Sequence, residues 1–478
     1  MQLSASLYKE VTKITEIMGV FQPVCDVASE VDANAVFIPS MMLTKQKYFA
    51  NGLKDSISCR LAMLGNRQTA EMCGDTYAAT ADDATMVCCM SAFQAHALQH
   101  NYVHDLEYMA FDVCGAFLHV DLQSPVQIIT RIPAVIRHPL AGQLCIVRKS
   151  CYGLRQSNKA FADDFSATIQ SAGFTPTTDP CVYKKIVPVP GGQAQRCYIS
   201  THVDDGKAMF NHRPLYDHLI EVLEKRYGTL KQSPLTGFTG TSFQLHANGA
   251  FTRSQDGFIL RFLESVNVKG IATAKAPSTP DLFTYVDNTP LCDPSLYKSL
   301  IGSLIYTLRT RYDIQKEVVH LASKSALPTA DADLAKVVLV LRYLAGTPRL
   351  GPTYHTLQGA ILKCFVDCSY GVHFDGRCHY GFSLHIGADN APFFVCSKKQ
   401  TECVAIGSME GEYVALSSAT RKVMEFRYFL ESIGFPQDEP TTIFEDNMSA
   451  INLAQAPAVT RRFRHIRIRH HGSRVCCH

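Results

Sequence analysis

Hydrophobic and polar positions along the chain divide it into three regions, the first of which is mixed. Short apolar runs typical of strands, such as 108–113 and 197–203, alternate there with stretches of helical spacing, such as 81–100 and 158–174. Both kinds of element occur between residue 1 and about residue 245. We therefore predict an α+β arrangement for this region.

The pattern becomes helical between residues 295 and 345. Apolar residues recur there at helical spacing, and Gly346 and Pro348 end the last of these helical patterns. The predicted helices are 295–310, 314–327 and 331–346. A linker, TAKAPSTPD (273–281), separates this helical unit from the first region.

Strand patterns return after about residue 360 and surround one long helical segment, 408–434. The predicted strands of this region are 362–367, 380–387, 392–397 and 441–446. In the first region, PVPGGQAQ (188–195) predicts a hairpin loop. The whole chain is thus expected to be α+β.

Composition and charge are typical of a globular protein and leave its partners open. The 478 residues suffice for about two to four domains. A net charge of +3 does not by itself indicate a nucleic-acid partner. Charged residues interrupt the N-terminus and no apolar run is long enough to cross a bilayer, so we expect an intracellular protein with no membrane partner.

The 18 cysteines are scattered, and we interpret them as reduced thiols rather than as a disulfide framework. The densest group of thiols and imidazoles is Cys364, Cys368, His373, Cys378 and His379. It lacks the CxxC spacing of structural zinc sites, so side chains on an ordinary hairpin are preferred over zinc.

Three carboxylates at strand ends point to a metal site. Asp204 and Asp205 interrupt the strand-like run YISTHVDDGKAMF (198–210), and neighbouring side chains of a straight strand point to opposite faces. We expect Gly206 to allow a turn that brings both acids to one cation, with a solvated turn as the alternative. Asp112 ends another apolar run, and carboxylates from two strands are what a two-metal polymerase site needs.

Several blocks resemble, in order, the reverse transcriptase of copia-type long-terminal-repeat retrotransposons. These blocks are FDVCGAFL (111–118), KSCYGLRQSNKAF (149–161), HVDD (202–205), LYKSLIGSLIYTLRTRYDI (296–314) and LRYLAGTPRLG (341–351). Three more resemble the ribonuclease H domain that follows it: CSKKQ (396–400), SMEGEYVALSSA (408–419) and EDNMSAINLA (445–454). The resemblance covers nearly the whole chain.

The resemblance implies a right-hand polymerase with fingers and palm in 1–250, a helical thumb or connection in 251–358, and an α/β ribonuclease H-like domain in 359–478. It implies RNA-directed DNA polymerase activity with two Mg²⁺ ions, or Mn²⁺, in each active site. The implied partners are an RNA or DNA template with its primer and deoxynucleoside triphosphates. The implied location is the cytoplasm, in a particle of the element, or the nucleus.

The resemblance also assigns roles within the polymerase region. Its catalytic, metal-binding triad corresponds to Asp112, Asp204 and Asp205, of which Asp204 is the preferred ligand. Its nucleotide-binding positions correspond to Arg60, Gly115, Ala116, Phe117, Arg155 and Gln156. Phe117 is placed like a steric gate against ribose, and Arg60 like a phosphate-binding arginine. From the residues alone, a core aromatic and a surface charge are the alternatives.

In the ribonuclease H region, the resemblance assigns the catalytic, metal-binding acids to Asp367, Glu412 and Asp446. Such a site uses two metal ions to activate water against an RNA phosphodiester. Glu410 lies two residues from Glu412 and therefore faces another side of the predicted helix.

Two departures from the family pattern concern charged positions. Arg467 stands where the family has an aspartate, and a fixed cation there opposes metal binding, so ribonuclease H activity is in question. Ser58 stands where the family has a lysine of the fingers, two residues before Arg60. The basic tail 460–474 fits a phosphate-binding segment, a nuclear address or a frayed end.

Three functions are consistent with these observations. The first is a reverse transcriptase with a ribonuclease H-like domain, and the second is a catalytically inactive, nucleic-acid-binding remnant of such an element. The third is a metal-dependent phosphatase or nuclease that uses only the C-terminal acids. We also expect the chain to be a piece of a longer polyprotein or a separately encoded part of one.

Overall fold

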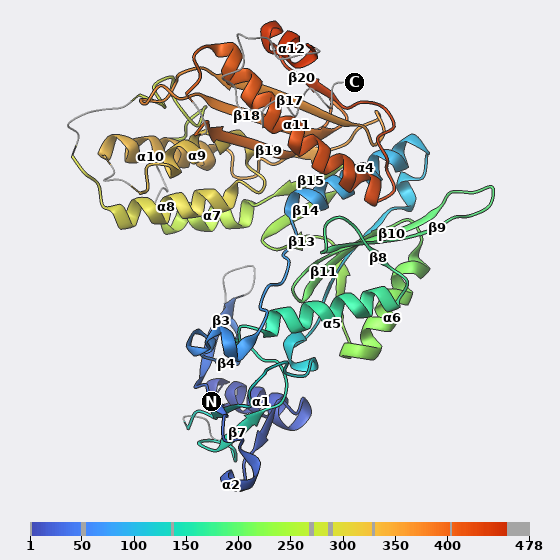
Figure 1. Ribbon diagram of the computed structural model, residues 1–478, viewed down its shortest axis with the longest axis vertical. Helices are drawn as coiled ribbons and strands as arrows, with labels where there is room; N and C mark the ends of the chain where they lie inside the picture. The colour runs from blue at the N-terminus through green and yellow to red at the C-terminus, as the bar shows by residue number, and fades with distance from the viewer. Residues whose placement is uncertain are drawn as a thin grey trace.

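The structure is a computed structural model that describes residues 2–48, 54–134, 138–266, 272–284, 290–326, 330–401 and 404–456. It is a mixed α+β fold with an N-terminal lobe, a central sheet, a helical bundle and a C-terminal sheet (Figure 1). Arg467 and the basic tail 460–474 lie outside the described residues. Within the described ranges, no helix combines the length and the apolarity needed to span a membrane.

The N-terminal lobe consists of a small sheet, a hairpin and the first helix. Its strands are β1 (Phe21–Pro23), β2 (Val36–Phe37), β3 (Ser40–Tyr48), β4 (Lys54–Met63), β6 (Ile128–Arg131) and β7 (Leu144–Val147), and its helices are α1 (Gln2–Thr12), α2 (Val27–Glu30) and α3 (Ala70–Cys73). α1 continues into a π-helical turn, η1 (Lys13–Ile17), and packs against β4. Val11, Ile14 and Leu61 share one buried core, which holds the end of α1 on β4.

The central sheet has the strand order β12-β5-β11-β10-β9-β8, and its neighbouring strands are antiparallel. Its strands are β5 (Glu107–Asp112), β8 (Thr175–Pro176), β9 (Val182–Val187), β10 (Gln195–His202), β11 (Asp205–Phe210) and β12 (Lys231–Pro234), and its covering helices are α4 (Asp83–Gln99), α5 (Ser157–Ser171) and α6 (Arg213–Tyr227). Phe111 and Phe210 pack under α5 and α6, whereas Tyr108 and Met209 face α4. Side chains alternate between the two faces, as expected for strands. The hairpin loop predicted at 188–195 is confirmed, because β9 and β10 pair on either side of it.

A second sheet, of order β13-β14-β15-β16, joins the central sheet to the helical bundle. These elements are β13 (Gly237–Phe238), β14 (Thr241–Leu245), β15 (Phe251–Ser254), α7 (Asp256–Ser265), α8 (Pro294–Thr307), α9 (Gln315–Ala322), α10 (Asp331–Gly346) and β16 (Thr353–Tyr354). The helix predicted at 331–346 is confirmed to the residue, while α9 ends five residues before the predicted 327. β14 and β15 pair with each other across residue 250, where the sequence analysis placed a domain boundary. The domain boundaries stay a prediction.

The C-terminal sheet has the order β19-β18-β17-β20, with β20 parallel to β17. Its elements are β17 (Leu362–Ser369), β18 (His379–Ile386), β19 (Pro392–Lys399), α11 (Ser408–Ser432), β20 (Thr442–Phe444) and α12 (Met448–Gln455). β20 is shorter than the predicted 441–446 because Asn447 caps α12. Its side chain accepts the N–H groups of Ser449 and Ala450, so the chain leaves the sheet before residue 447.

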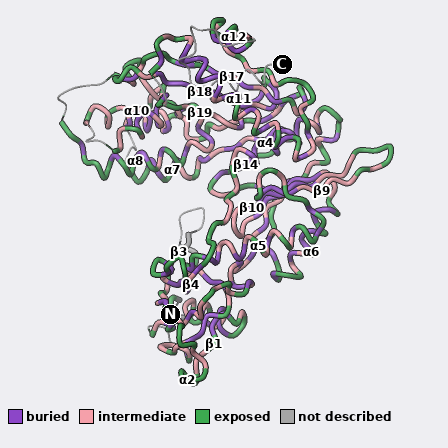
Figure 2. The backbone as a smooth tube through the Cα atoms, viewed as in Figure 1, coloured by how far each residue is buried: buried purple, intermediate pink, exposed green. Residues whose placement is uncertain are grey.

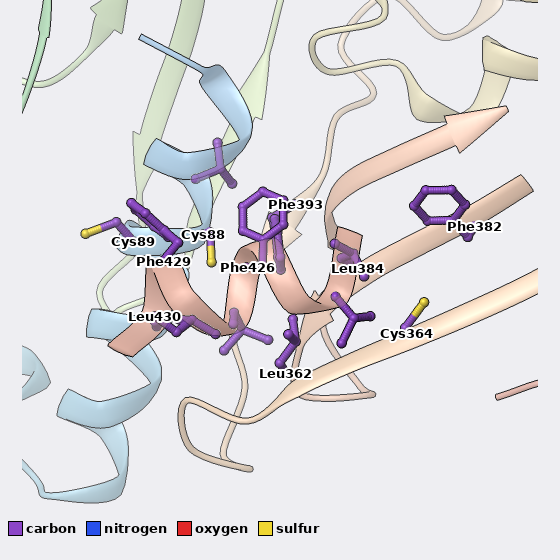
Figure 3. Close-up of a cluster of buried hydrophobic side chains, with 14 of the residues drawn as sticks. Cys88, Cys89, Leu362, Cys364, Phe382, Leu384, Phe393, Phe426, Phe429 and Leu430 are labelled. Carbon is purple, nitrogen blue, oxygen red and sulfur yellow. The ribbon is translucent and has the colours of Figure 1, made fainter. Parts of the chain in front are cut away.

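α4 connects the central and C-terminal sheets through one continuous core. Phe426, Phe429 and Leu430 of α11 pack beside Cys88 and Cys89 of α4 (Figure 3). Most of α4 is buried, because it lies between two sheets (Figure 2). A hydrogen bond from the Tyr198 hydroxyl to the Ile433 carbonyl, 2.9 Å, crosses the same boundary. The C-terminal sheet and α11 are therefore packed against the central sheet through α4.

Candidate functional site

A row of acidic and basic side chains crosses one end of the central sheet. The strand register places Lys231, Asp112, Asp205 and His202 next to one another on four adjacent strands. Directly opposed residues in antiparallel strands have Cβ atoms about 4.5–5.5 Å apart. Asp112 and Asp205 therefore face each other, and Nζ of Lys231 lies 3.6 Å from Oδ2 of Asp112. We call these four residues the acid row.

Asp204 reaches the acid row from the tight turn between β10 and β11. The register of these strands leaves Val203 and Asp204 as the two central residues of the turn. Val203 has a φ of 58°, which costs a β-branched residue free energy. The Asp204 carbonyl accepts the Val113 N–H at 3.0 Å. This bond ties the turn, and with it Asp204, to the end of β5.

The expectation that Gly206 forms this turn is wrong. Gly206 lies inside β11, directly opposite Phe111 of β5. A Cβ at position 206 would lie 2.1 Å from the Phe111 ring. Glycine is needed there because the ring occupies the space of a side chain. This packing keeps the neighbouring residues Asp112 and Asp205 in register.

Burial and mutual repulsion oppose ionisation of these acids. Burial raises the pKa of the Asp204 carboxyl, and the charge of Asp112 adds to that effect while Arg60 opposes it. Burial also raises the pKa of Asp205, and the charges of Asp204 and Asp112 raise it further. Three carboxylates in this arrangement favour a bound cation, and carboxylate oxygens suit Mg²⁺ or Mn²⁺.

Arg60 and Phe117 both contact Tyr152, near the acid row. The Arg60 guanidinium lies 4.9 Å from the centre of the Tyr152 ring, and the Phe117 ring meets the same ring edge-on at 5.6 Å. The charge of Arg60 acts on Asp204, so this group faces the acids. Tyr152 was not singled out from the sequence, although it lies in a block that resembles the family. Its contacts with Arg60 and Phe117, which come from two other segments, indicate that it belongs to the site.

The other predicted nucleotide-binding residues lie in two loops. Gly115 has a φ of 74° and precedes a 3₁₀ turn that begins at Ala116. Gln156 is buried, and its side-chain oxygen accepts an N–H of Gln68 at 3.0 Å. The Arg155 guanidinium donates to the Gln68 carbonyl at 3.0 Å. The side chains of Arg155 and Gln156 thus fasten their loop to Gln68, and their predicted contact with nucleotide stays a prediction.

A second acidic group lies at the C-terminal sheet. Asp367 lies inside β17, Glu412 in α11, and Asp446 in the loop after β20. Their ligand atoms all lie within 4.8 Å of one another. No other three residues of the described ranges meet this distance, and Asp112, Asp204 and Asp205 are more widely spaced. Glu410 is separate from the group, and its carboxylate accepts the Ile406 N–H at 2.8 Å.

The charges of this second group act most strongly on Glu412. Burial raises its pKa to about 8, and the charges of Glu445, Asp367 and Asp446 add to that. Oε2 of Glu412 and Oε2 of Glu445 are buried without a hydrogen-bond partner among the described residues. Glu445 was not predicted from the sequence, because its neighbour Asp446 matched the family position. The unpaired oxygens fit a divalent cation, which would compensate both charges.

The pKa of Glu412 predicts how pH changes the effect of magnesium on stability. Because its pKa is raised on folding, Glu412 favours the folded state below its unfolded pKa, and this contribution is lost as pH rises through about 8. Mg²⁺ should restore it. We expect the Mg²⁺-induced rise in melting temperature to grow from pH 6 to pH 9, by about 2–4 °C for each kcal/mol of binding free energy. Differential scanning fluorimetry with and without Mg²⁺ measures this.

Glu412→Gln should abolish the growth of this increment with pH. Glu410→Gln is the matched control, because it lies on the same helix and glutamine can still accept the Ile406 N–H. An increment in the unmodified protein that is equal at both pH values would exclude Glu412 as a metal ligand.

Comparisons with known proteins find relatives among transposon Pol polyproteins. No family model matches the sequence. The chain is 29% identical over 370 residues to the retrovirus-related Pol polyprotein from transposon RE1 of Arabidopsis thaliana, a match that covers 75% of this chain and 24% of that protein. It is 28% identical over 389 residues to that from transposon TNT 1-94 of Nicotiana tabacum, covering 77% of this chain and 28% of that protein. The chain thus spans about a quarter of the length of these curated relatives.

A solved structure agrees with these relatives in fold. The foamy viral protease-reverse transcriptase, determined in complex with double-stranded DNA, matches with a TM-score of 0.53 at 12% identity. The match covers 95% of this chain and 64% of that one, and at this identity it shows the fold alone. The sequence of the chain is thus similar to retrovirus-related Pol polyproteins of copia-type plant transposons, and its fold is similar to that of the foamy viral protease-reverse transcriptase.

Proposed function

We propose that the chain is an RNA-directed DNA polymerase with an attached ribonuclease H-like domain. The observation that carries the proposal is the acid row, in which Asp112 and Asp205 face each other on adjacent strands with Asp204 at the neighbouring turn. In this proposal the central sheet is the palm, the β3–β4 hairpin belongs to the fingers, and helices α7 to α10 form the thumb or connection.

The donor set of the acid row fits a divalent metal. Carboxylate oxygens are hard ligands, and a divalent cation between them would relieve their mutual repulsion. In the proposal Asp112 and Asp204 hold Mg²⁺ or Mn²⁺, with Asp205 beside them. The bound metal would supply Lewis acidity toward the primer hydroxyl and the triphosphate.

The other residues of the site orient the nucleotide in this proposal. Arg60 contacts the phosphates through its planar guanidinium, and Tyr152 holds that group by stacking. Phe117 excludes a ribose 2′-hydroxyl, and edge-on contact with Tyr152 holds its ring in position. The primer 3′-hydroxyl then attacks the α-phosphate, the new P–O bond forms, and pyrophosphate leaves.

The C-terminal domain is proposed to have a ribonuclease H-like fold with a metal site at Asp367, Glu412 and Asp446. The family position occupied by Arg467 lies outside the described residues. RNA cleavage is therefore not part of the proposal, which rests on nucleotidyl transfer alone.

The proposed partner is a primer–template duplex with deoxynucleoside triphosphates. The foamy viral structure contains double-stranded DNA, which supports a duplex partner for a chain of the same fold. Contacts to backbone phosphates make such binding sensitive to salt. We expect primer–template affinity to fall at least about tenfold between 50 and 200 mM salt.

Primer extension tests the proposed activity directly. The chain is incubated with poly(rA)/oligo(dT), dTTP and Mg²⁺, and extension products are resolved on a gel. We expect extension that EDTA abolishes and that added Mg²⁺ or Mn²⁺ restores.

A folded chain that binds primer–template in a polarisation assay but adds no nucleotide would contradict the proposal. That outcome would favour the alternative, an inactive nucleic-acid-binding remnant, which Ser58 in place of a fingers lysine also favours.

A further inference from the structure

Lys13 approaches the proposed nucleotide site from a segment in which the sequence analysis assigned no site residue. It begins the π-helical turn η1, which follows α1. π-Helical turns are rare and occur frequently at functional sites, because the extra residue redirects a side chain. A Cβ at position 115 would lie 3.1 Å from Nζ of Lys13. The ammonium group thus lies over Gly115, three residues after Asp112.

Gly115 is suited to this approach by its backbone. Its φ of 74° is in the left-handed region, which glycine adopts without strain. The absence of a side chain leaves room for the lysine ammonium beside the loop. The resemblance to the family assigned the same loop, Gly115 and Ala116, to the triphosphate.

Lys13 and Arg60 approach the site from two elements that pack on each other, α1 with its π-helical extension and β4. Both charges act on Glu10. Burial raises the pKa of Glu10, and Lys13, the Leu61 N–H and Arg60 oppose this. Neither cation has a hydrogen bond or ion pair with the described residues, so each has donors available for a ligand.

We propose that Lys13 is a phosphate-binding residue, which with Arg60 binds the triphosphate of the incoming nucleotide beside Gly115. Lys13 thereby supplies the cation that the fingers lack at Ser58, since Ser58 lies on β4 and carries no charge. This inference rests on the proposed polymerase function for the identity of the ligand. The chemistry it requires is more general: an oligophosphate recognised by an ammonium and a guanidinium group.

Binding of inorganic tripolyphosphate, measured by isothermal titration calorimetry, tests the site without catalysis. Lys13→Met should weaken it about tenfold, the loss of one charge-assisted contact, while Lys13→Arg stays within about threefold because it keeps the charge. Lys9→Met is the matched control, since Lys9 is exposed in the last turn of α1, just before η1, and this variant should bind like the unmodified chain.

Primer extension kinetics provide the second measurement. Lys13→Met should raise KM for dTTP about tenfold and change kcat by less than about threefold. Primer–template affinity and melting temperature should not change.

Equal effects of Lys13→Met and Lys9→Met in both measurements would overturn the inference while leaving the polymerase proposal intact. Lys13-dependent binding of tripolyphosphate by a chain that extends no primer would have the opposite meaning: the phosphate site stands, and the polymerase proposal fails.

Discussion

Asp204→Asn and Asp112→Asn are each expected to lower the rate of primer extension roughly a thousandfold, or about 4 kcal/mol of transition-state stabilisation. Each change removes a charged oxygen ligand from the acid row or from the turn beside it. Single-turnover extension of oligo(dT) on poly(rA) measures the effect.

Loss of activity in these variants should not come from unfolding. Because the pKa of Asp204 is raised by burial and by Asp112, its ionised form costs stability at neutral pH. Asp204→Asn should therefore melt at the same temperature as the unmodified chain, or higher, in the absence of metal. Asp217→Asn, an exposed acid on α6, is the control for activity and stability.

The variant Asp205→Asn distinguishes two roles for Asp205: a metal ligand or a residue that shapes the turn. A loss as large as that of Asp204→Asn would make Asp205 a ligand, while a loss below about tenfold would make it a residue that shapes the turn. Undiminished extension by Asp204→Asn or Asp112→Asn would exclude the metal site that we propose.

Asp83→Asn is expected to lower the free energy of unfolding by about 3–5 kcal/mol, because it leaves buried cations without their partner. Asp83 begins α4, and its Oδ2 lies 2.5 Å from Nη2 of Arg253, whose side chain is 0% exposed. Burial opposes the charge of Arg253, but the Asp83 carboxylate offsets this and keeps the pKa of Arg253 above its usual value. Urea denaturation followed by circular dichroism measures the loss.

The carboxylate of Asp83 also acts on a second buried cation, Lys207. Lys207 lies on β11, one row of side chains below Asp205, with its ammonium 4.6 Å from the centre of the Phe238 ring. Burial lowers its pKa to about 7, although Asp83 raises it. The pKa of Lys207 is thus depressed on folding, so stability should increase as pH rises from about 7 toward the pKa of an exposed lysine. Lys207→Met should remove this increase.

The double variant Asp83→Asn/Lys207→Met should recover part of the stability lost in Asp83→Asn, since one of the unpaired cations is gone. The exposed pair of Arg213 and Asp217 is the control, and Asp217→Asn should cost less than about 1 kcal/mol. Equal losses for Asp83→Asn and Asp217→Asn would show that Asp83 holds no buried charge in place.

Helices with local stop signals could be predicted closely from the sequence. α10 ends at Gly346, as the glycine and the following Pro348 predicted, and the predicted helix 408–434 differs from α11 only at its last two residues. The strand predicted at 362–367 continues to Ser369, because β18 pairs with it along its whole length. Strand ends depend on a partner from elsewhere in the chain, and no local pattern reports that partner.

In the candidate site too, residues with a local signal could be predicted, and residues defined by distant partners could not. Asp112 could be singled out because an acid ended an apolar run, and β5 does end there. Gly206 was misread because a glycine after two acids predicts a turn, whereas its actual constraint is the Phe111 ring across the sheet. Lys13 and Tyr152 could not be singled out, because the residues that they contact are distant in the sequence. Glu445 was missed because its neighbour Asp446 matched the family position.

Local patterns along the chain were enough to predict the periodic elements, the acids at strand ends and the blocks that resemble the Pol polyproteins. These features are local, since side-chain period, turn residues and motif spacing are written along a few neighbouring residues. The folded structure was needed to show that Asp112 faces Asp205, that Lys13 lies over Gly115, and that α4 joins two sheets in one core. Register and packing bring together segments that are far apart in the chain, so they depend on all of those segments at once.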